Sequence, residues 1–266
     1  MKKIIFSFAL FFVALTCGAQ TTDPAVLETL KKLNSHYYCL TCDGVQNFEC
    51  TVDSDLFDHL KMLIQKKYGS ADARTVALQK SRIRLTFPAK NDFKLDLDYD
   101  PIGDEKFDEG VYQIFKTIEF TFRLGFYPWG SSNLNPFFGG DDFKNHVFKI
   151  EKDDKGFSVV SSGDEPVTQL VDNEYRVYEM KTNFRALIRD AKLNYVKGEK
   201  GLMVHSVNAE FVGGATMDTQ IEYKAVGKYW MPSQIKNHKE KFGLTHSSKE
   251  DSVFSFGDYK INEPGK

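Results

Sequence analysis

The sequence predicts an α+β protein that is mainly antiparallel β, with a strongly curved sheet or half-open β-barrel and about three helices packed over its concave side. From about residue 146 onward, short runs of alternating apolar and polar residues follow one another with turn residues between them. Before residue 130, apolar residues also recur at three- and four-residue steps, which is typical of amphipathic helices.

Residues 1–19 predict a cleavable secretory signal peptide. Two lysines precede the apolar run Ile4–Leu15, whose length of about 12 residues is typical of a signal and too short to span a bilayer, which takes about 20. Small residues at Cys17–Ala19 place the cleavage before Gln20. We therefore expect an extracytoplasmic protein, either periplasmic or secreted.

Lipidation of Cys17 is the alternative for this segment. A lipidation motif would place Leu three residues before the cysteine and a small residue directly before it, whereas Ala14 and Thr16 stand there. An anchor through Cys17 is therefore the less favoured interpretation.

The mature chain, residues 20–266, is expected to form a single β-rich domain. It has 33 basic and 37 acidic residues after the two signal lysines are removed, so its net charge is 33 − 37 = −4. Nucleic-acid binding and a polybasic membrane anchor both call for clustered positive charge, and neither is supported. No later segment is apolar for long enough to be a transmembrane segment.

The N-terminal part is predicted to mix helices and strands. Asp23-Pro24 opens a helix over residues 24–38, since Asp caps helices and Pro favours their first position. A strand over 45–52 follows, then a helix capped at Asp53-Ser54 and a short helix over 71–80. Alternation predicts two further strands, around 82–87 and 93–99.

The most apolar helix is predicted over residues 107–125. It continues into a Phe/Tyr/Trp/Pro segment and the loop 131–142. A buried core helix would explain this stripe, and so would a lid or liner of an apolar cavity. On the second interpretation the ligand contacts are Phe115, Ile118, Phe122, Phe126 and Trp129.

Strand signals fill the rest of the chain. A hairpin is predicted around Asp153–Gly156, and more runs follow near 167–171, 174–181, 187–197, 202–212, 218–226, 229–239 and 252–261.

The mature chain has three cysteines, two of them in Cys39-Leu-Thr-Cys42. A redox-active pair belongs at a helix N-terminus, where the dipole lowers the thiol pKa, but this pair follows a helix. A structural zinc site needs four ligands, so His36 would have to join all three cysteines. We expect a structural disulfide of Cys39 with Cys42 or Cys50, and a buried thiol left over.

Other polar patterns predict surfaces rather than sites. Asp96-x-Asp98-x-Asp100 resembles the start of a calcium loop, but Pro101 and Phe107 stand where that loop needs Gly and Glu. Gly139–Asp142 is predicted to be a loop whose acids could hold a cation. The six histidines lack the spacing of a metalloprotease, and no G-x-S-x-G motif occurs. No catalytic residue, metal or cofactor is predicted.

The order of elements resembles the periplasmic lipoprotein carrier and receptor superfamily. Two stretches carry the likeness: Tyr229–Ile235, with its W-x-P segment, and Phe254–Asn262, which is similar to the closing strand of that group. The resemblance implies a half-open β-barrel with helices over its mouth that shelters acyl chains. The family's lid arginine and membrane-inserting leucine have no match here.

The functional hypothesis is an exported binder or carrier of an apolar or lipid-like small molecule, which could work with an outer-membrane or other envelope protein. Burial of each CH₂ group contributes about 0.8 kcal/mol, so one or two acyl chains would suffice for useful affinity. Two alternatives remain open: an exported hydrolase or metal-dependent enzyme with a spatially assembled site, and a ligand-free surface interaction module.

Overall fold

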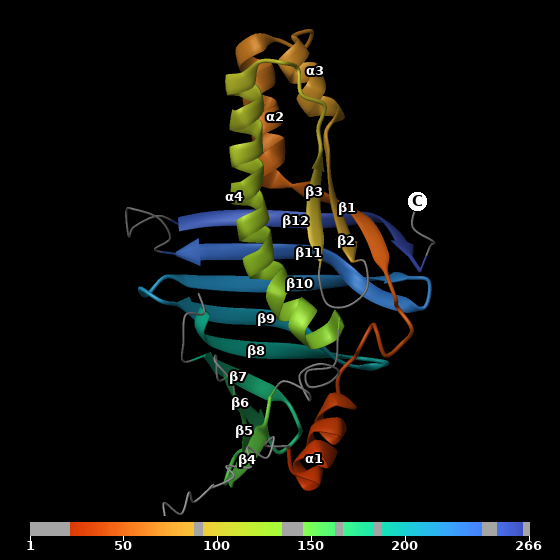
Figure 1. The fold of residues 1–266 in the computed structure, drawn as a ribbon, viewed down its shortest axis with the longest axis vertical. Coiled ribbons are helices and arrows are strands. Elements are labelled where there is room, and N and C mark those ends of the chain that lie inside the picture. The colour runs from red at the N-terminus through yellow and green to blue at the C-terminus, as the bar shows by residue number, and fades with distance from the viewer. Residues whose placement is uncertain are drawn as a thin grey trace, which may run out of the picture.

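The computed structural model describes residues 22–87, 93–134, 146–162, 167–182, 188–240 and 249–262. Their strands form one sheet of 12 strands in the order β3-β2-β1-β12-β11-β10-β9-β8-β7-β6-β5-β4. All neighbouring strands that pair are antiparallel. Within the described residues β3 and β4 are the two edges, so the sheet is open rather than closed into a barrel (Figure 1).

The strands of the C-terminal part follow the predicted meander, in which each strand pairs with the next. The 12 strands are β1 Phe48–Ser54, β2 Arg82–Phe87, β3 Lys94–Asp98, β4 Phe148–Asp153, β5 Gly156–Ser161, β6 Val167–Asp172, β7 Val177–Thr182, β8 Ile188–Gly198, β9 Gly201–Phe211, β10 Thr216–Val226, β11 Tyr229–Glu240 and β12 Lys249–Ile261. The N-terminal strand β1 pairs with the last strand, β12, and thereby joins β1–β3 to the meander.

Four α-helices and one π-helical turn accompany the sheet within the described residues. They are α1 Pro24–Asn34, α2 Asp55–Tyr68, α3 Ala73–Lys80, α4 Glu105–Trp129 and the turn η1 Gly130–Leu134. Figure 1 shows α4 running across one face of the sheet, while α2, α3 and the first half of α4 extend beyond β12. None of these helices is both long enough and apolar enough to cross a bilayer.

Helix α1 begins where the sequence predicts and ends earlier. The Asp23 carboxylate accepts a hydrogen bond from the Ala25 amide at 2.7 Å, as an N-cap does. The prediction extended the helix to residue 38, but it ends at Asn34. The reason is tertiary: the Leu202 amide donates to the His36 carbonyl, and the Tyr38 amide donates to the Leu202 carbonyl. Residues 36–38 are therefore held as an extended segment against β9.

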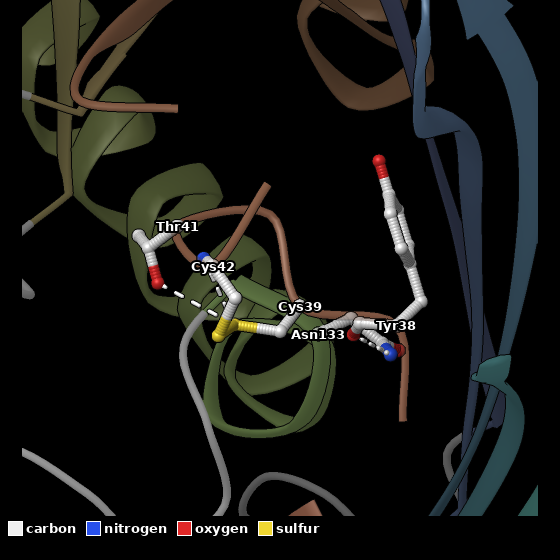
Figure 2. Close-up of a disulfide and its surroundings, with 5 residues drawn as sticks. All are labelled: Tyr38, Cys39, Thr41, Cys42 and Asn133. Atoms are coloured by element: carbon white, nitrogen blue, oxygen red, sulfur yellow. Dashed lines mark hydrogen bonds between the residues drawn. A yellow bond between two sulfur atoms is a disulfide. The ribbon is translucent and has the colours of Figure 1, made fainter. Parts of the chain in front are cut away.

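Asn133, in η1, ties this segment to the sheet and to the end of α4. Its amide nitrogen donates to the carbonyls of Tyr38 at 2.9 Å and Leu202 at 3.0 Å, and its amide oxygen accepts from the Val204 amide at 2.8 Å. Figure 2 shows Asn133 beside Tyr38 and next to the turn closed by the disulfide Cys39–Cys42. One fully buried side chain thus fixes three separate parts of the chain.

Some predicted features lie outside the described residues. These are the signal segment 1–19 with Cys17, the loop Gly139–Asp142 and most of the neighbouring aromatic loop, and His246.

Candidate functional site

The five side chains predicted to contact an apolar ligand lie on one buried face of α4. Each is at most 9% exposed: Phe115, Ile118, Phe122, Phe126 and Trp129. The ring centroids of Phe122 and Phe126 are 4.9 Å apart, and those of Phe126 and Trp129 are 4.8 Å apart. Phe122 also meets Phe254 of β12 edge to face at 5.3 Å. The structure brings the predicted residues together, and their role as ligand contacts stays a prediction.

A row of polar side chains crosses the sheet beneath α4. Thr219 of β10 pairs with Asn237 of β11, which pairs with Ser252 of β12, and all three are at most 2% exposed. The Thr219 hydroxyl donates to the Asn237 amide oxygen at 3.0 Å. The row two residues further along the same face is apolar and is formed by Ile221, Ile235 and Phe254. The polar row therefore borders an apolar row on this face of the sheet.

Gly125 of α4 lies directly over this row. A Cβ atom added at residue 125 would come within 2.4 Å of the Asn237 amide oxygen, far inside normal contact distance. Only a residue without a Cβ lets the helix backbone approach the sheet this closely. The helix and the polar row are thus fitted to each other at residue 125.

Several polar atoms along α4, η1 and the strands beneath them have no hydrogen-bond partner among the residues that the structure describes. They are Trp129 Nε1, Ser132 Oγ, Asn237 Nδ2 and Ser252 Oγ, all fully buried. Each of these groups can donate a hydrogen bond. A buried donor without a partner costs about 1–3 kcal/mol, so a set of them at one interface calls for an explanation.

Lys239 adds a positive charge to the same face. It lies two residues beyond Asn237 on β11, its side chain is only 7% exposed, and its Nζ donates to the Thr121 hydroxyl of α4 at 3.4 Å. A lysine is rarely buried to this degree in an apolar layer. The described interface between α4 and the sheet therefore combines aromatic rings, donors without a partner among the described residues, and one ammonium group.

A separate groove of about 580 Å³ lies between β7 and β8 and is within the size range of ligand pockets. Its apolar part is formed by Leu193, Tyr195, Leu202 and Tyr178. Its polar part is formed by His36, Asp172, Glu174, Arg176, Asn194 and Lys197. None of the five predicted α4 residues lines it.

The cysteines occupy two different environments. Cys39 and Cys42 form a disulfide that closes a tight turn after α1, while Cys50 of β1 is a buried free thiol. Burial raises the pKa of Cys50 to about 12, so this thiol stays protonated and unreactive at neutral pH.

The acidic residues of β3 lie in ion pairs on the strand. Asp96 and Asp98 of β3 form ion pairs with Lys94 at 2.6 Å and with Arg84 at 3.5 Å, as residues of an exposed strand face would. Among the residues that the structure describes, no group of three or more His, Cys, Asp or Glu side chains could hold a metal ion.

Sequence reasoning missed the polar row and the β7–β8 groove. Alternation along each strand does place Thr219, Asn237 and Ser252 on the inner face of its own strand. Only the register between the strands aligns the three, and no local pattern contains that register.

Comparison with known proteins adds no relative to this description: no family model, no curated protein and no solved structure matches the chain.

Proposed function

We propose that the protein is an exported binding or carrier protein for an apolar or lipid-like ligand, which it holds between the curved sheet and α4. The observation that carries the proposal is the set of buried donors without partners in an aromatic interface. An apolar ligand with an oxygen-bearing head group would supply what these donors lack.

The chemistry of the interface indicates which head group fits. Indole N–H, amide N–H and hydroxyl groups all donate to acceptor oxygens. A carboxylate or a phosphate ester offers several acceptor oxygens, and its charge strengthens the hydrogen bonds that it accepts. The aromatic side chains beside the polar row, above all Phe122 and Phe126, would then pack on the acyl chain, where each buried CH₂ contributes about 0.8 kcal/mol.

The closed interface sets the entry route. The rings of α4 pack on each other and on β12, so a ligand has to displace α4 from the sheet. Unmet donors make the closed state less stable than an apolar interface of the same shape would be. On this proposal α4 acts as a lid, and the sheet with its helices acts as the half-open barrel of the lipoprotein carriers that the sequence resembles.

The test uses the mature protein and a fatty acid with a fluorescent group at the end of its chain. We expect saturable binding after solvent extraction of any co-purified lipid. Ser252→Ala should weaken binding of the acid by at least about tenfold, which corresponds to one lost hydrogen bond to a charged group. Ser158→Ala, on the distant strand β5, is the matched control and should leave the affinity unchanged.

Stability measured on the same variants separates function from packing. Ser252→Ala removes a buried hydroxyl without a partner, so it should raise the free energy of unfolding of the ligand-free protein by about 1–3 kcal/mol. Absence of any bound lipid and of any uptake of the probe would contradict the proposal.

A further inference from the structure

The sheet divides where β7 and β8 separate. These strands pair at only three positions, from Glu179 opposite Lys192 to Lys181 opposite Asp190. Strand β8 continues to Gly198 and stays paired with β9 on its other side all the way. In the pairs formed by the described residues, Asn194–Gly198 therefore has a strand neighbour on one side only.

Two register shifts lie at the point of separation, one in β7 and one in β9. The register of β7 with β6 shifts next to Tyr178, since Leu170 pairs with Glu179 but Val171 pairs with Val177. The register of β8 with β9 shifts between Asn194 and Tyr195. The extra residue is Tyr178 on β7 and His205 on β9. A bulge bends its strand and interrupts pairing, and the bulge in β7 lies where the pairing of β7 with β8 ends.

At the separation, the backbone groups on the edge of β7 already have hydrogen-bond partners. The Val177 amide donates to the Tyr37 hydroxyl at 2.7 Å, and the Tyr195 hydroxyl donates to the Val177 carbonyl at 2.8 Å. Burial raises the pKa of Tyr37 to about 12, which keeps this hydroxyl neutral. Two tyrosine hydroxyls thus make the bonds that a neighbouring strand would make to Val177 of β7. Among the described residues, the facing edge of β8 has no partner strand.

The groove of about 580 Å³ follows this edge of β8. Leu193, Tyr195 and Lys197 alternate along the strand and line the groove together with Arg176 and Tyr178 from the β7 side. Asn194, from the opposite face of β8, lines it as well, as expected of a gap between two strands. The groove combines a free strand edge, apolar side chains and a terminal positive charge.

We propose that this groove binds an extended polypeptide segment of a partner protein, which pairs with Asn194–Gly198 as an added strand. Addition of a strand to an exposed sheet edge is a common mode of peptide recognition, in which backbone bonds give affinity and alternate side chains give specificity. Five residues of β8 span about 17 Å, so a partner segment of five or six residues suffices. An antiparallel segment would place apolar side chains opposite Leu193 and Tyr195 and an acidic one opposite Lys197.

The probe is the fluorescent, acetylated peptide Glu-Thr-Val-Thr-Val, which runs antiparallel to β8 from Lys197 to Leu193. We expect saturable binding by fluorescence anisotropy and, in the complex, slower hydrogen exchange of those Asn194–Gly198 amides that point into the groove and not to β9. N-methyl groups on alternate amides of the same peptide block the backbone ladder only when the methylated amides face β8. Of its two methylation patterns, one should abolish binding and the other should not.

A charge swap tests the register. Lys197→Glu should weaken binding of the acidic peptide about fivefold, which is the size of one cross-strand charge pair. The peptide Lys-Thr-Val-Thr-Val should then bind the variant with the original affinity. Lys192→Glu, on the opposite face of the same strand, is the matched control and should change neither peptide.

Each of three results would overturn the proposal: no saturable binding of either peptide, equal binding of both methylated forms, or binding without protection of Asn194–Gly198. The site is separate from the one proposed beneath α4. Loss of peptide binding with fatty-acid binding intact would refute this inference alone.

Discussion

Replacement of Asn133 by alanine tests whether this one side chain joins α4, the segment after α1 and β9. The substitution removes three short hydrogen bonds, to the Tyr38 carbonyl, the Leu202 carbonyl and the Val204 amide. The Leu202 carbonyl keeps the bond from the Tyr38 amide, so two buried groups lose their partner. At about 1–3 kcal/mol for each, the free energy of unfolding should fall by about 2–6 kcal/mol.

Urea denaturation followed by circular dichroism measures this loss. A domain is typically stable by about 5–15 kcal/mol, so the midpoint should fall substantially at an unchanged slope. Asn133→Asp should cost at least as much near neutral pH, because a carboxylate cannot donate to the two carbonyls that the amide nitrogen contacts. Asn208→Ala, an exposed matched control, should stay within about 0.5 kcal/mol. A loss below about 1 kcal/mol for Asn133→Ala would refute the reasoning.

Three further predictions concern the helix, the disulfide and a surface histidine. Gly125→Ala should lower the free energy of unfolding, measured in urea, by about 1–3 kcal/mol, because the added Cβ clashes with Asn237 of the sheet. Gly110→Ala, in open space on the same helix, should raise it by about 0.5–1 kcal/mol. Equal effects of the two substitutions would contradict the close approach of α4 to the sheet. Reduction of the disulfide Cys39–Cys42, which closes a loop of sequence separation 3, should lower the free energy of unfolding by about 2 kcal/mol from chain entropy. An unchanged urea midpoint in the presence of reductant would contradict this prediction. A hydrogen bond to Asp251 raises the pKa of His238. This pair therefore stabilises the fold fully below the unfolded pKa of about 6.5, and the stabilisation is lost as pH rises through the higher folded pKa. Asp251→Asn should lower the pKa of His238 in an NMR titration, and an unchanged pKa would exclude the pair.

Local patterns accounted for most elements of the fold. The alternation of the C-terminal part predicted the meander because each of its strands pairs with its sequence neighbour. The hairpin at Asp153–Gly156 was predictable from its turn residues: the Asp153 carboxylate accepts from the amides of Lys155 and Gly156, at 2.7 and 2.8 Å. The stripe of apolar residues likewise predicted α4 to within a few residues at each end.

Long-range contacts accounted for the rest. Nothing near β1 in the sequence indicates that Phe48 lies opposite Ile261 of β12, because the register comes from packing across some two hundred residues. The predicted helix extended over residues 36–38, whereas backbone bonds to Leu202 hold this segment against β9. The role of Asn133 could not be predicted, since a polar residue in Ser131–Leu134 is typical of an ordinary loop.

The candidate site divides in the same way. The five apolar residues of α4 were predictable because one helix carries them all. The polar row and the free edge of β8 were not, since both depend on strand registers and on bulges at Glu222/Tyr223 and Asn194/Tyr195.

The most direct test of the central claim is photo-crosslinking of residues 20–266 with a fatty acid that carries a photoreactive group along its chain, followed by peptide mapping. If the ligand lies between α4 and the sheet, the crosslinks should fall on α4 near Phe122 and Phe126 and on β11 and β12, and an excess of unlabelled fatty acid should abolish them. Specific crosslinks confined to other elements, or none that unlabelled fatty acid displaces, would contradict the account.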